Sequence, residues 1–159
     1  MAKGNEIIVT ANPRGVFLEG TLSGALKPGT VVQIDVSEGI DSNGNLSWEA
    51  YNADADGNRR LIAVLLPDTL RGKLATEAYT SGDHCFVYVP QPGEQLNMLI
   101  ADVAGTADDH SFGELLIVDD GTGKLIATTG TPESEPFVLL EAITDPTADT
   151  LAHCIFTGY

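Results

Sequence analysis

One stretch constrains the fold of this chain more than any other: two apolar runs joined by a turn that contains two prolines. Residues 84–89 alternate, so that Cys85 and Val87 share one face of a strand and the aromatic residues beside them share the other. The prolines at positions 90 and 92 cannot donate ladder hydrogen bonds, so this strand has to end there. Residues 96–101 restart an extended run. The stretch is structural in character and predicts two consecutive strands.

The rest of the chain has the same character, short apolar runs separated by turn signals. About ten short strands at a spacing of roughly 8–15 residues, without an amphipathic helix of four turns, indicate an all-β sandwich or barrel. The run from Leu61 to Leu66 is apolar throughout, as in a strand buried on both faces. Trp48, the sole Trp, is expected to anchor the core rather than to bind a ligand. No fixed-period repeat is visible.

Length and charge set the broad class of the protein. At 159 residues the chain fits one domain. We divide it into residues 1–30, read as an N-terminal arm with edge strands, and residues 31–159, read as the β-barrel or sandwich domain. Its 8 basic and 23 acidic residues give a net charge of −15. This balance argues against nucleic acid and anionic membranes as partners, because both are bound mainly through Lys and Arg.

Two loops have partial similarity to ligand-binding motifs. The loop that carries Asp54 and Asp56 resembles the start of an EF-hand, but the twelfth position, where a bidentate acidic ligand is needed, is Ala63. An Asp-rich turn between strands is the preferred interpretation, and an adventitious Ca²⁺ site is the alternative. Residues 120–124 resemble a phosphate-binding loop but lack its first Gly and its final Ser or Thr, so they predict a tight hairpin.

The remaining candidates for chemistry do not combine into an active site. The histidines His84, His110 and His153 have no metal-ligand spacing, and no Gly-x-Ser-x-Gly elbow is present. Cys85 and Cys154 each lie in an apolar run and are expected to be buried free thiols, with a disulfide as the alternative. The sequence therefore predicts no enzyme activity, no metal and no cofactor.

Two segments are candidates for contact with a partner. Residues 1–30 form either edge strands or an arm that lies on a neighbouring subunit. Four of the 8 basic residues fall between Arg59 and Lys73, which forms either a contact patch or ordinary surface pairing with local carboxylates. The candidate contact residues are Ile7, Ile8, Val9, Asn12, Pro13, Arg14, Phe17, Arg59, Arg60, Arg71 and Lys73.

Several phrases, spread over most of the chain, resemble those of a known family. They are Lys27-Pro28-Gly29-Thr30-Val31-Val32-Gln33-Ile34, Ala63-Val64-Leu65-Leu66-Pro67-Asp68 with Leu70-Arg71-Gly72-Lys73, Tyr79-Thr80-Ser81-Gly82-Asp83, Pro92-Gly93-Glu94-Gln95-Leu96-Asn97-Met98, Gly113-Glu114-Leu115-Leu116, and Pro136-Phe137 with Leu140-Glu141-Ala142. Together they resemble the small capsid decoration (cement, head-stabilising) proteins of tailed bacteriophages. None of these phrases is a catalytic signature.

The resemblance implies a compact, β-tulip-like barrel or sandwich domain with an extended N-terminal arm. It further implies a homotrimer, made in the host cytoplasm, that sits on the outer capsid surface of the virion. There it would bind the major capsid protein and clamp neighbouring subunits, without an active site, a cofactor, nucleic acid or a membrane. The first alternative is a β-sandwich carbohydrate-binding module, possible also on a virion, although aromatic residues make up only 6% of the chain. The second is a tail or head-fibre component.

Overall fold

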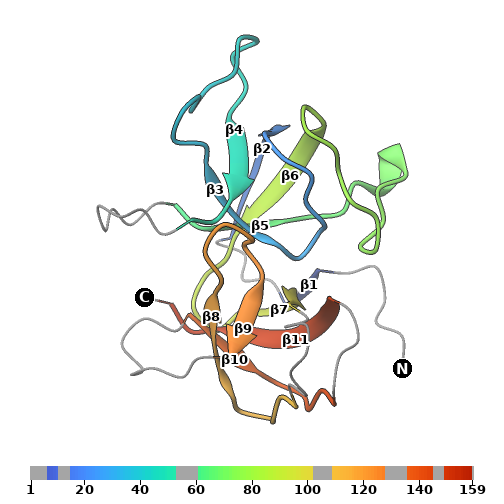
Figure 1. Cartoon of the computed structure of the whole chain (residues 1–159), viewed down its shortest axis with the longest axis vertical. Helices are drawn as coiled ribbons and strands as arrows, with labels where there is room; N and C mark the ends of the chain where they lie inside the picture. Colours follow the sequence, from blue (N-terminus) through green and yellow to red (C-terminus); the bar gives the residue numbers. More distant parts are fainter. Residues whose placement is uncertain are drawn as a thin grey trace.

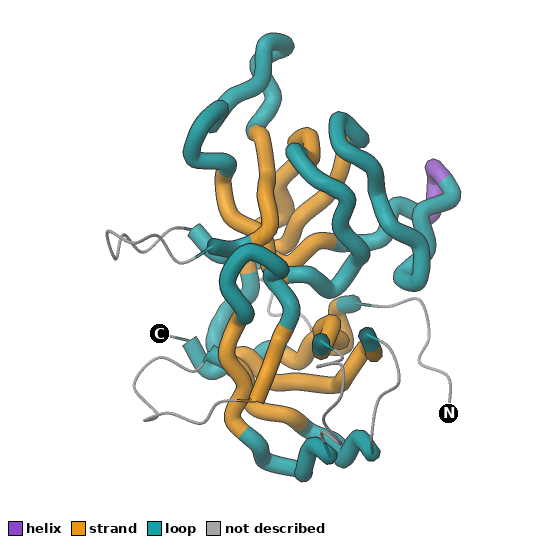
Figure 2. Tube along the Cα trace, in the orientation of Figure 1, coloured by secondary structure: helices purple, strands orange, loops and turns teal. Residues whose placement is uncertain are grey.

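The chain folds into short β-strands joined by tight turns. The structure, a computed structural model, describes residues 7–10, 15–52, 61–101, 109–127, 136–144 and 149–158 (Figures 1 and 2). The elements are β1 (Ile8–Thr10), β2 (Val16–Leu22), β3 (Val31–Ile34), β4 (Ser47–Ala50), β5 (Ala63–Leu65), the 3-10 helix η1 (Thr69–Arg71), β6 (His84–Val89), β7 (Gln95–Ile100), β8 (Leu115–Val118), β9 (Leu125–Ala127), β10 (Phe137–Leu139) and β11 (Thr150–Phe156). The all-β prediction is confirmed.

The strands close into two rings, stacked one above the other in Figure 1. The first barrel has the order β2-β4-β3-β5-β6. The second has the order β7-β11-β10-β8-β9 and is closed by pairing between β7 and β9, while β1 adds to the free part of β7. The β-barrel prediction is thus confirmed, and the structure adds that there are two barrels. The division of the chain at residue 30 stays a prediction.

The two barrels have the same topology. In each one, the first strand is parallel to the third, every other pair is antiparallel, and the ring runs first-third-second-fourth-fifth. The pairings also correspond: Leu22–Trp48, Ile34–Trp48, Val32–Ala63, Leu65–Val87 and Leu18–Val87 in the first barrel, and Ile100–Leu125, Val118–Leu125, Leu116–Phe137, Leu139–Cys154 and Leu96–Cys154 in the second. The same set of equivalent residues therefore holds all the way around both rings.

Equivalent positions also fill the two cores. In the first barrel they are Leu22, Val32, Trp48, Ala63, Leu65, Cys85 and Val87, and in the second Ile100, Leu116, Leu125, Phe137, Leu139, Ala152 and Cys154. All fourteen are at most 2% exposed. The interval between equivalent residues shortens along the chain, from Ile34–Val118 to Val87–Cys154, because the loops differ in length. A search for a fixed period in the sequence therefore finds nothing.

Side-chain volume is exchanged between the two cores at one position. A Cβ on Gly20 would lie 2.5 Å from Nε1 of Trp48, so this glycine leaves the room that the indole ring occupies. In the second barrel the equivalent pair is Met98 and Leu125, both fully buried. In the first barrel a large indole ring lies opposite a glycine, and in the second barrel two side chains of middle size fill the corresponding volume, as close packing of a core requires. The prediction that Trp48 anchors the core is confirmed.

Strands of the first barrel that face the second barrel are buried on both sides. Val64 and Tyr88 point out of the first barrel and pack with residues of the second, whereas Leu65 and Val87 belong to the core of the first. A strand with two buried faces needs apolar residues at consecutive positions rather than at alternate ones. This is the physical reason for the continuous apolar run, and the prediction of burial on both faces is confirmed for residues 62–66, whereas Leu61 is 44% exposed.

Glycines allow the backbones of the two barrels to meet. Gly29, with a φ of 87°, donates its N–H to the carbonyl of Leu65 at 2.9 Å and accepts the N–H of Leu99 at 3.0 Å. Val31 donates its N–H to the carbonyl of Gly123 at 2.7 Å. A Cβ on Gly123 would lie 2.2 Å from the carbonyl oxygen of Val31, so only glycine permits this approach. We call the backbone contacts that Gly29, Val31 and Gly123 make between the two barrels the seam.

The double-proline turn connects the two barrels. The hydroxyl of Tyr88, at the end of β6, donates to Oε1 of Glu94 at 2.6 Å, and the backbone N–H of Gln91 donates to Oε2 at 2.8 Å. Both Tyr88 and Glu94 are buried, so the pair holds the turn in place while the chain passes from one ring to the next. The stretch is structural, as its sequence predicts.

Candidate contact surfaces

A short turn with a defined shape projects from the first barrel, between β5 and β6 (Figure 1). We call residues 68–74 the contact turn. Asp68 is 4% exposed; its side chain accepts the backbone N–H of Arg71 at 3.3 Å and so caps η1. Gly72 ends the helix in the left-handed region with a φ of 76°, and Lys73 donates its N–H to the carbonyl of Asp68 at 2.8 Å. The segment thus forms a single 3-10 turn, with Asp68 immediately before it.

Contacts with the barrel hold the contact turn at both ends. The hydroxyl of the buried Tyr79 donates to the carbonyl of Leu66 at 2.8 Å, just before the turn. The ammonium group of Lys73 lies 3.1 Å from Oδ2 of Asp83. The backbone N–H of Thr80 and then Lys73 lower the pKa of Asp83, so this carboxylate stays charged at neutral pH. The turn is therefore preorganised, which lowers the entropy cost of binding.

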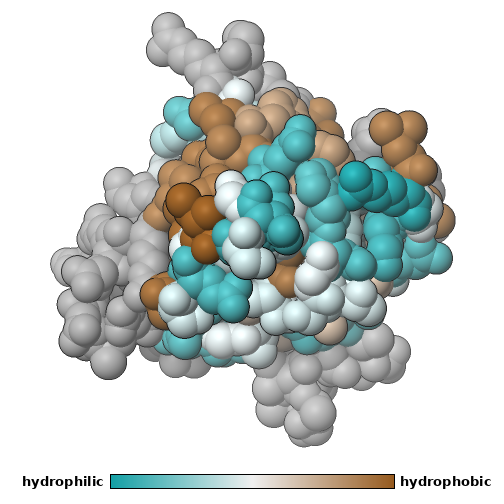
Figure 3. Space-filling model, turned by 90° about the horizontal axis from the view of Figure 1, so that it is seen from above, coloured by the Kyte–Doolittle hydropathy of each residue, from teal (hydrophilic) through white to brown (hydrophobic). Residues whose placement is uncertain are grey.

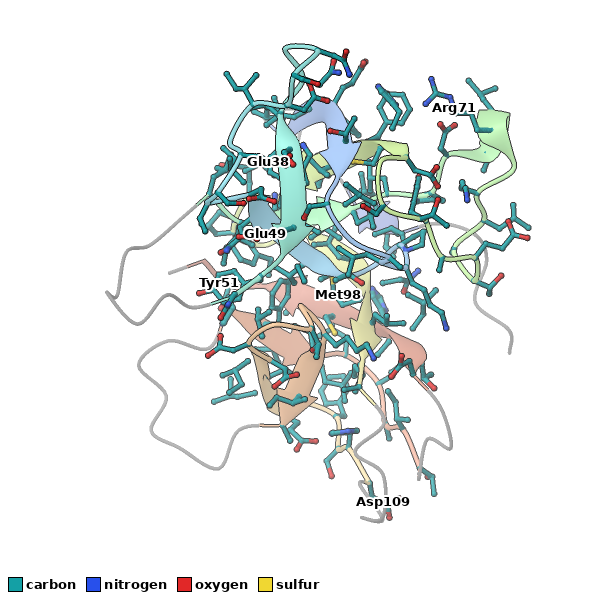
Figure 4. The ribbon with its side chains drawn as sticks, turned by 45° about the horizontal axis from the view of Figure 1, so that its top comes forward. Glu38, Glu49, Tyr51, Arg71, Met98 and Asp109 are labelled. Atoms are coloured by element: carbon teal, nitrogen blue, oxygen red, sulfur yellow. The ribbon has the colours of Figure 1, made fainter. Side chains whose placement is uncertain are left out.

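The contact turn displays an apolar side chain beside a cation. Leu70 is 97% exposed and Leu74 is 44% exposed. The guanidinium of Arg71 lies 3.6 Å from the carboxylate of Asp68 but remains 57% exposed. Figure 4 shows Arg71 at the outer end of the projecting turn. Arginine is enriched among the few residues that supply most of the binding energy of a protein interface, and an exposed leucine beside it adds apolar area that a partner can bury. The arrangement suits a protein partner with an apolar socket and an acidic rim.

A second exposed apolar area lies where β2 begins. Val16 and Phe17 are 47% and 60% exposed, and the ring of Phe17 lies 4.9 Å from that of the buried Tyr88. An apolar groove of about 310 Å³ lies at the junction of the barrels and is lined in part by Leu61 and Pro92. Val16 pairs with Val89 on β6, and Val89 also lines this groove.

The structure places only some of the predicted contact residues at the surface. Ile7 is 2% exposed within the core of the second barrel, Ile8 packs against that core, and Val9 is 41% exposed. Phe17, Arg71 and Lys73 lie on the two surfaces described above. Asn12, Pro13, Arg14, Arg59 and Arg60 lie outside the described residues, as does the loop of Asp54 and Asp56. The contact role of all these residues stays a prediction.

Sequence reasoning missed the apolar members of the surface, above all Leu70 and Leu74. The exposure of these leucines depends on what packs against each side chain, which the residues adjacent to them in the chain do not determine. The loop between β3 and β4 also exposes Val36 and Ile40, at 58% and 62%. Seen from this end, the surface of the first barrel has separate hydrophobic areas within a largely hydrophilic surround (Figure 3).

The three histidines, which are the candidate metal ligands in the sequence, lie apart from each other and have different partners. His84 faces Glu19 with 3.4 Å between Nε2 and Oε2, His110 faces Glu114 with 3.3 Å between Nδ1 and Oε2, and His153 pairs with a glutamine on β7. Within the described ranges, no three His, Cys, Asp or Glu residues gather as metal ligands would. None of the helical segments in the described part of the chain has the length and apolar character needed to cross a membrane.

The cysteines lie in different barrels. Cys85 and Cys154 are both buried and both free, which confirms the preferred interpretation over a disulfide. Burial raises the pKa of the Cys85 thiol to about 12. A thiol held protonated in this way is a poor nucleophile, so Cys85 acts as a small apolar core residue.

Comparisons with known proteins show similarity in fold alone. No protein family matches the chain, and no curated protein sequence matches it. Among solved structures, the chain is similar to the head fiber gp8.5 N base of bacteriophage phi29, with a TM-score of 0.53 and 11% sequence identity. The match covers 90% of this chain and 94% of that chain. Both barrels are thus included in the similarity.

Proposed function

We propose that this chain is a structural protein of a bacteriophage head that binds the outer capsid surface and clamps neighbouring copies of the major capsid protein. The observation that carries the proposal is the fold similarity to a phage head fiber base over nearly the full length of both chains. The family phrases in the sequence point independently to a bacteriophage head. The protein is proposed to act as a homotrimer, without catalysis or cofactor.

The surface chemistry supports this proposal. A net charge of −15 keeps many copies soluble before assembly and disfavours binding to the packaged DNA. The contact turn presents Leu70 and Arg71 on a rigid support. A preformed surface of this kind suits a folded partner such as a shell protein better than a flexible ligand such as a single-stranded nucleic acid. Many copies, each with a modest contact, stabilise the expanded shell by mass action. The sole Trp is buried, so it cannot serve as the stacking platform of a carbohydrate-binding module.

Replacing one leucine tests the assignment of the contact turn. Leu70→Asp puts a charge where an apolar socket would close, and we expect at least a tenfold loss of affinity for purified heads. Phe112→Asp is the matched control, since Phe112 is also highly exposed, at 71%, but belongs to the second barrel. Co-sedimentation of each variant with heads gives the occupancy. Equal binding by both variants would exclude the contact turn, and no binding by the wild type would exclude the function.

A head-fibre base is the second candidate, because the similar structure is one. The two roles differ in where the protein sits and in what it does for the shell. A clamp occupies three-fold and quasi-three-fold positions and raises the temperature at which heads release DNA. A fibre base occupies attachment points and leaves that temperature unchanged. Cryo-electron microscopy of decorated heads, with DNA release measured on heating, separates the two.

A further inference from the structure

The outer face of the second barrel carries a continuous apolar surface, which we call the outer wall. It consists of Leu115, Ile117, Ile126, Val138 and Ile155. The pairings Ile117–Ile126, Leu115–Val138 and Val138–Ile155 place these residues side by side across four strands. Their neighbours along each strand point into the core, so these five point outward. All five are half-buried rather than buried, so part of each side chain meets solvent.

The first barrel shows what covers such a wall. The positions equivalent to Leu115, Val138 and Ile155 are Val31, Val64 and Tyr88, and all three are fully buried. The second barrel covers them at the seam. The turn between β8 and β9, residues 119–124, takes part directly: Val31 donates to the carbonyl of Gly123 at 2.7 Å, and Gly121 donates to the carbonyl of Tyr51 at 2.9 Å. One barrel wall therefore already binds the connection between the second and third strands of another barrel.

The chain offers a second connection of the same kind. In the first barrel the second and third strands are joined by residues 35–46, which project from the end of the molecule (Figure 1). This loop is held in shape by Asp41, whose Oδ1 accepts the N–H groups of Asn43 and Asn45 at 2.8 and 2.9 Å. Although it is acidic, it exposes Val36 and Ile40. The position equivalent to Gly123 is Leu46 in this loop, and its carbonyl already accepts the N–H of Thr21 at 2.8 Å, so the loop can dock only through its exposed side chains and not through a close backbone approach.

We propose that the loop of residues 35–46 in one copy of this chain docks on the outer wall of the second barrel in another copy. The occupant is a second copy because, at the seam, the equivalent wall of the first barrel already binds the equivalent connection of the second barrel. The contact is head-to-tail, so it builds closed rings, such as the proposed homotrimer, or open arrays rather than two-fold dimers. It does not depend on binding to a phage head.

Sedimentation velocity of complementary variants tests this contact. The wild type should associate as its concentration rises, whereas Ile40→Asp, with a damaged loop, and Ile126→Asp, with a damaged wall, should each weaken association at least tenfold. A mixture of the two variants retains one intact loop and one intact wall, so it should form dimers and nothing larger. Leu70→Asp, in the contact turn, is the control and should associate like the wild type. Ile126→Thr, a milder polar change that suits a strand, covers the case in which Ile126→Asp does not fold.

Three results would overturn the proposal. One is a wild type that stays monomeric at all concentrations. Another is association of the Ile40 and Ile126 variants at the wild-type level. The third is a monomeric wild type whose Ile126 variants lose binding to heads, which would assign the outer wall to the shell protein instead. Failure of the self-contact leaves the proposed attachment through Leu70 unaffected, since the two are measured separately.

Discussion

The seam predicts a large difference between two glycines in one turn. Gly123 and Gly121 both have left-handed backbones, with φ of 67° and 81°. Replacing either by Ala places a Cβ in a strained region at a cost of about 1 kcal/mol. At Gly121 the new Cβ meets nothing within 4 Å, so that cost is the whole effect. At Gly123 it would lie 2.2 Å from the carbonyl oxygen of Val31, so the barrels have to separate locally.

The separation adds to the cost at Gly123. It lengthens or breaks the 2.7 Å hydrogen bond from Val31 to Gly123, worth about 1 kcal/mol, and loosens the packing around it by a similar amount. We therefore expect Gly123→Ala to lower the free energy of unfolding by about 3 kcal/mol and Gly121→Ala by about 1 kcal/mol. In a domain of this size these losses lower Tm by about 9 °C and about 3 °C. Urea unfolding and calorimetry measure both, and equal losses in the two variants would refute the seam.

Three further predictions concern the interior. Gly20→Ala should lower the free energy of unfolding by about 2 kcal/mol, because the new Cβ would lie 2.2 Å from the backbone carbonyl oxygen of Leu46 and 2.5 Å from Nε1 of Trp48. Trp48→Leu removes only the second of these clashes, so the loss caused by Gly20→Ala should be smaller in the Trp48→Leu background than in the wild type, and a double-mutant cycle in urea measures this coupling. Burial, and then the adjacent buried carboxylate, raise the pKa of Tyr88. The contribution of the neutral Tyr88 hydroxyl to stability is therefore full below about pH 10, the ordinary tyrosine value, and is lost as the pH rises further. The urea midpoint should fall less steeply with increasing pH in Tyr88→Phe than in the wild type. Cys85 and Cys154 are buried, so a thiol reagent at about pH 8, near the ordinary thiol pKa, should modify neither in the folded protein and both in denaturant; rapid labelling without denaturant would contradict this core assignment.

Individual strands were predictable because their signals are local. The double proline after β6, the hairpin at residues 119–124 and the apolar run at 61–66 are each encoded by residues that are adjacent in the chain. The buried state of Trp48 and of both cysteines followed in the same way, from an apolar residue in an alternating strand. The contact turn was partly predicted: its position and its cations were identified, whereas Leu70 was not, because exposure depends on what packs against a side chain.

The sequence by itself determined that this chain is built of short β-strands, that it is strongly acidic, and where its strands have to end. Only the tertiary structure decided that the strands close twice into the same ring, because closure depends on register between strands far apart in the chain. The two barrels have the same positions buried but different residues at those positions, as Gly20 with Trp48 and Met98 with Leu125 illustrate. The seam, too, rests on the meeting of two distant backbones at Gly29 and Gly123.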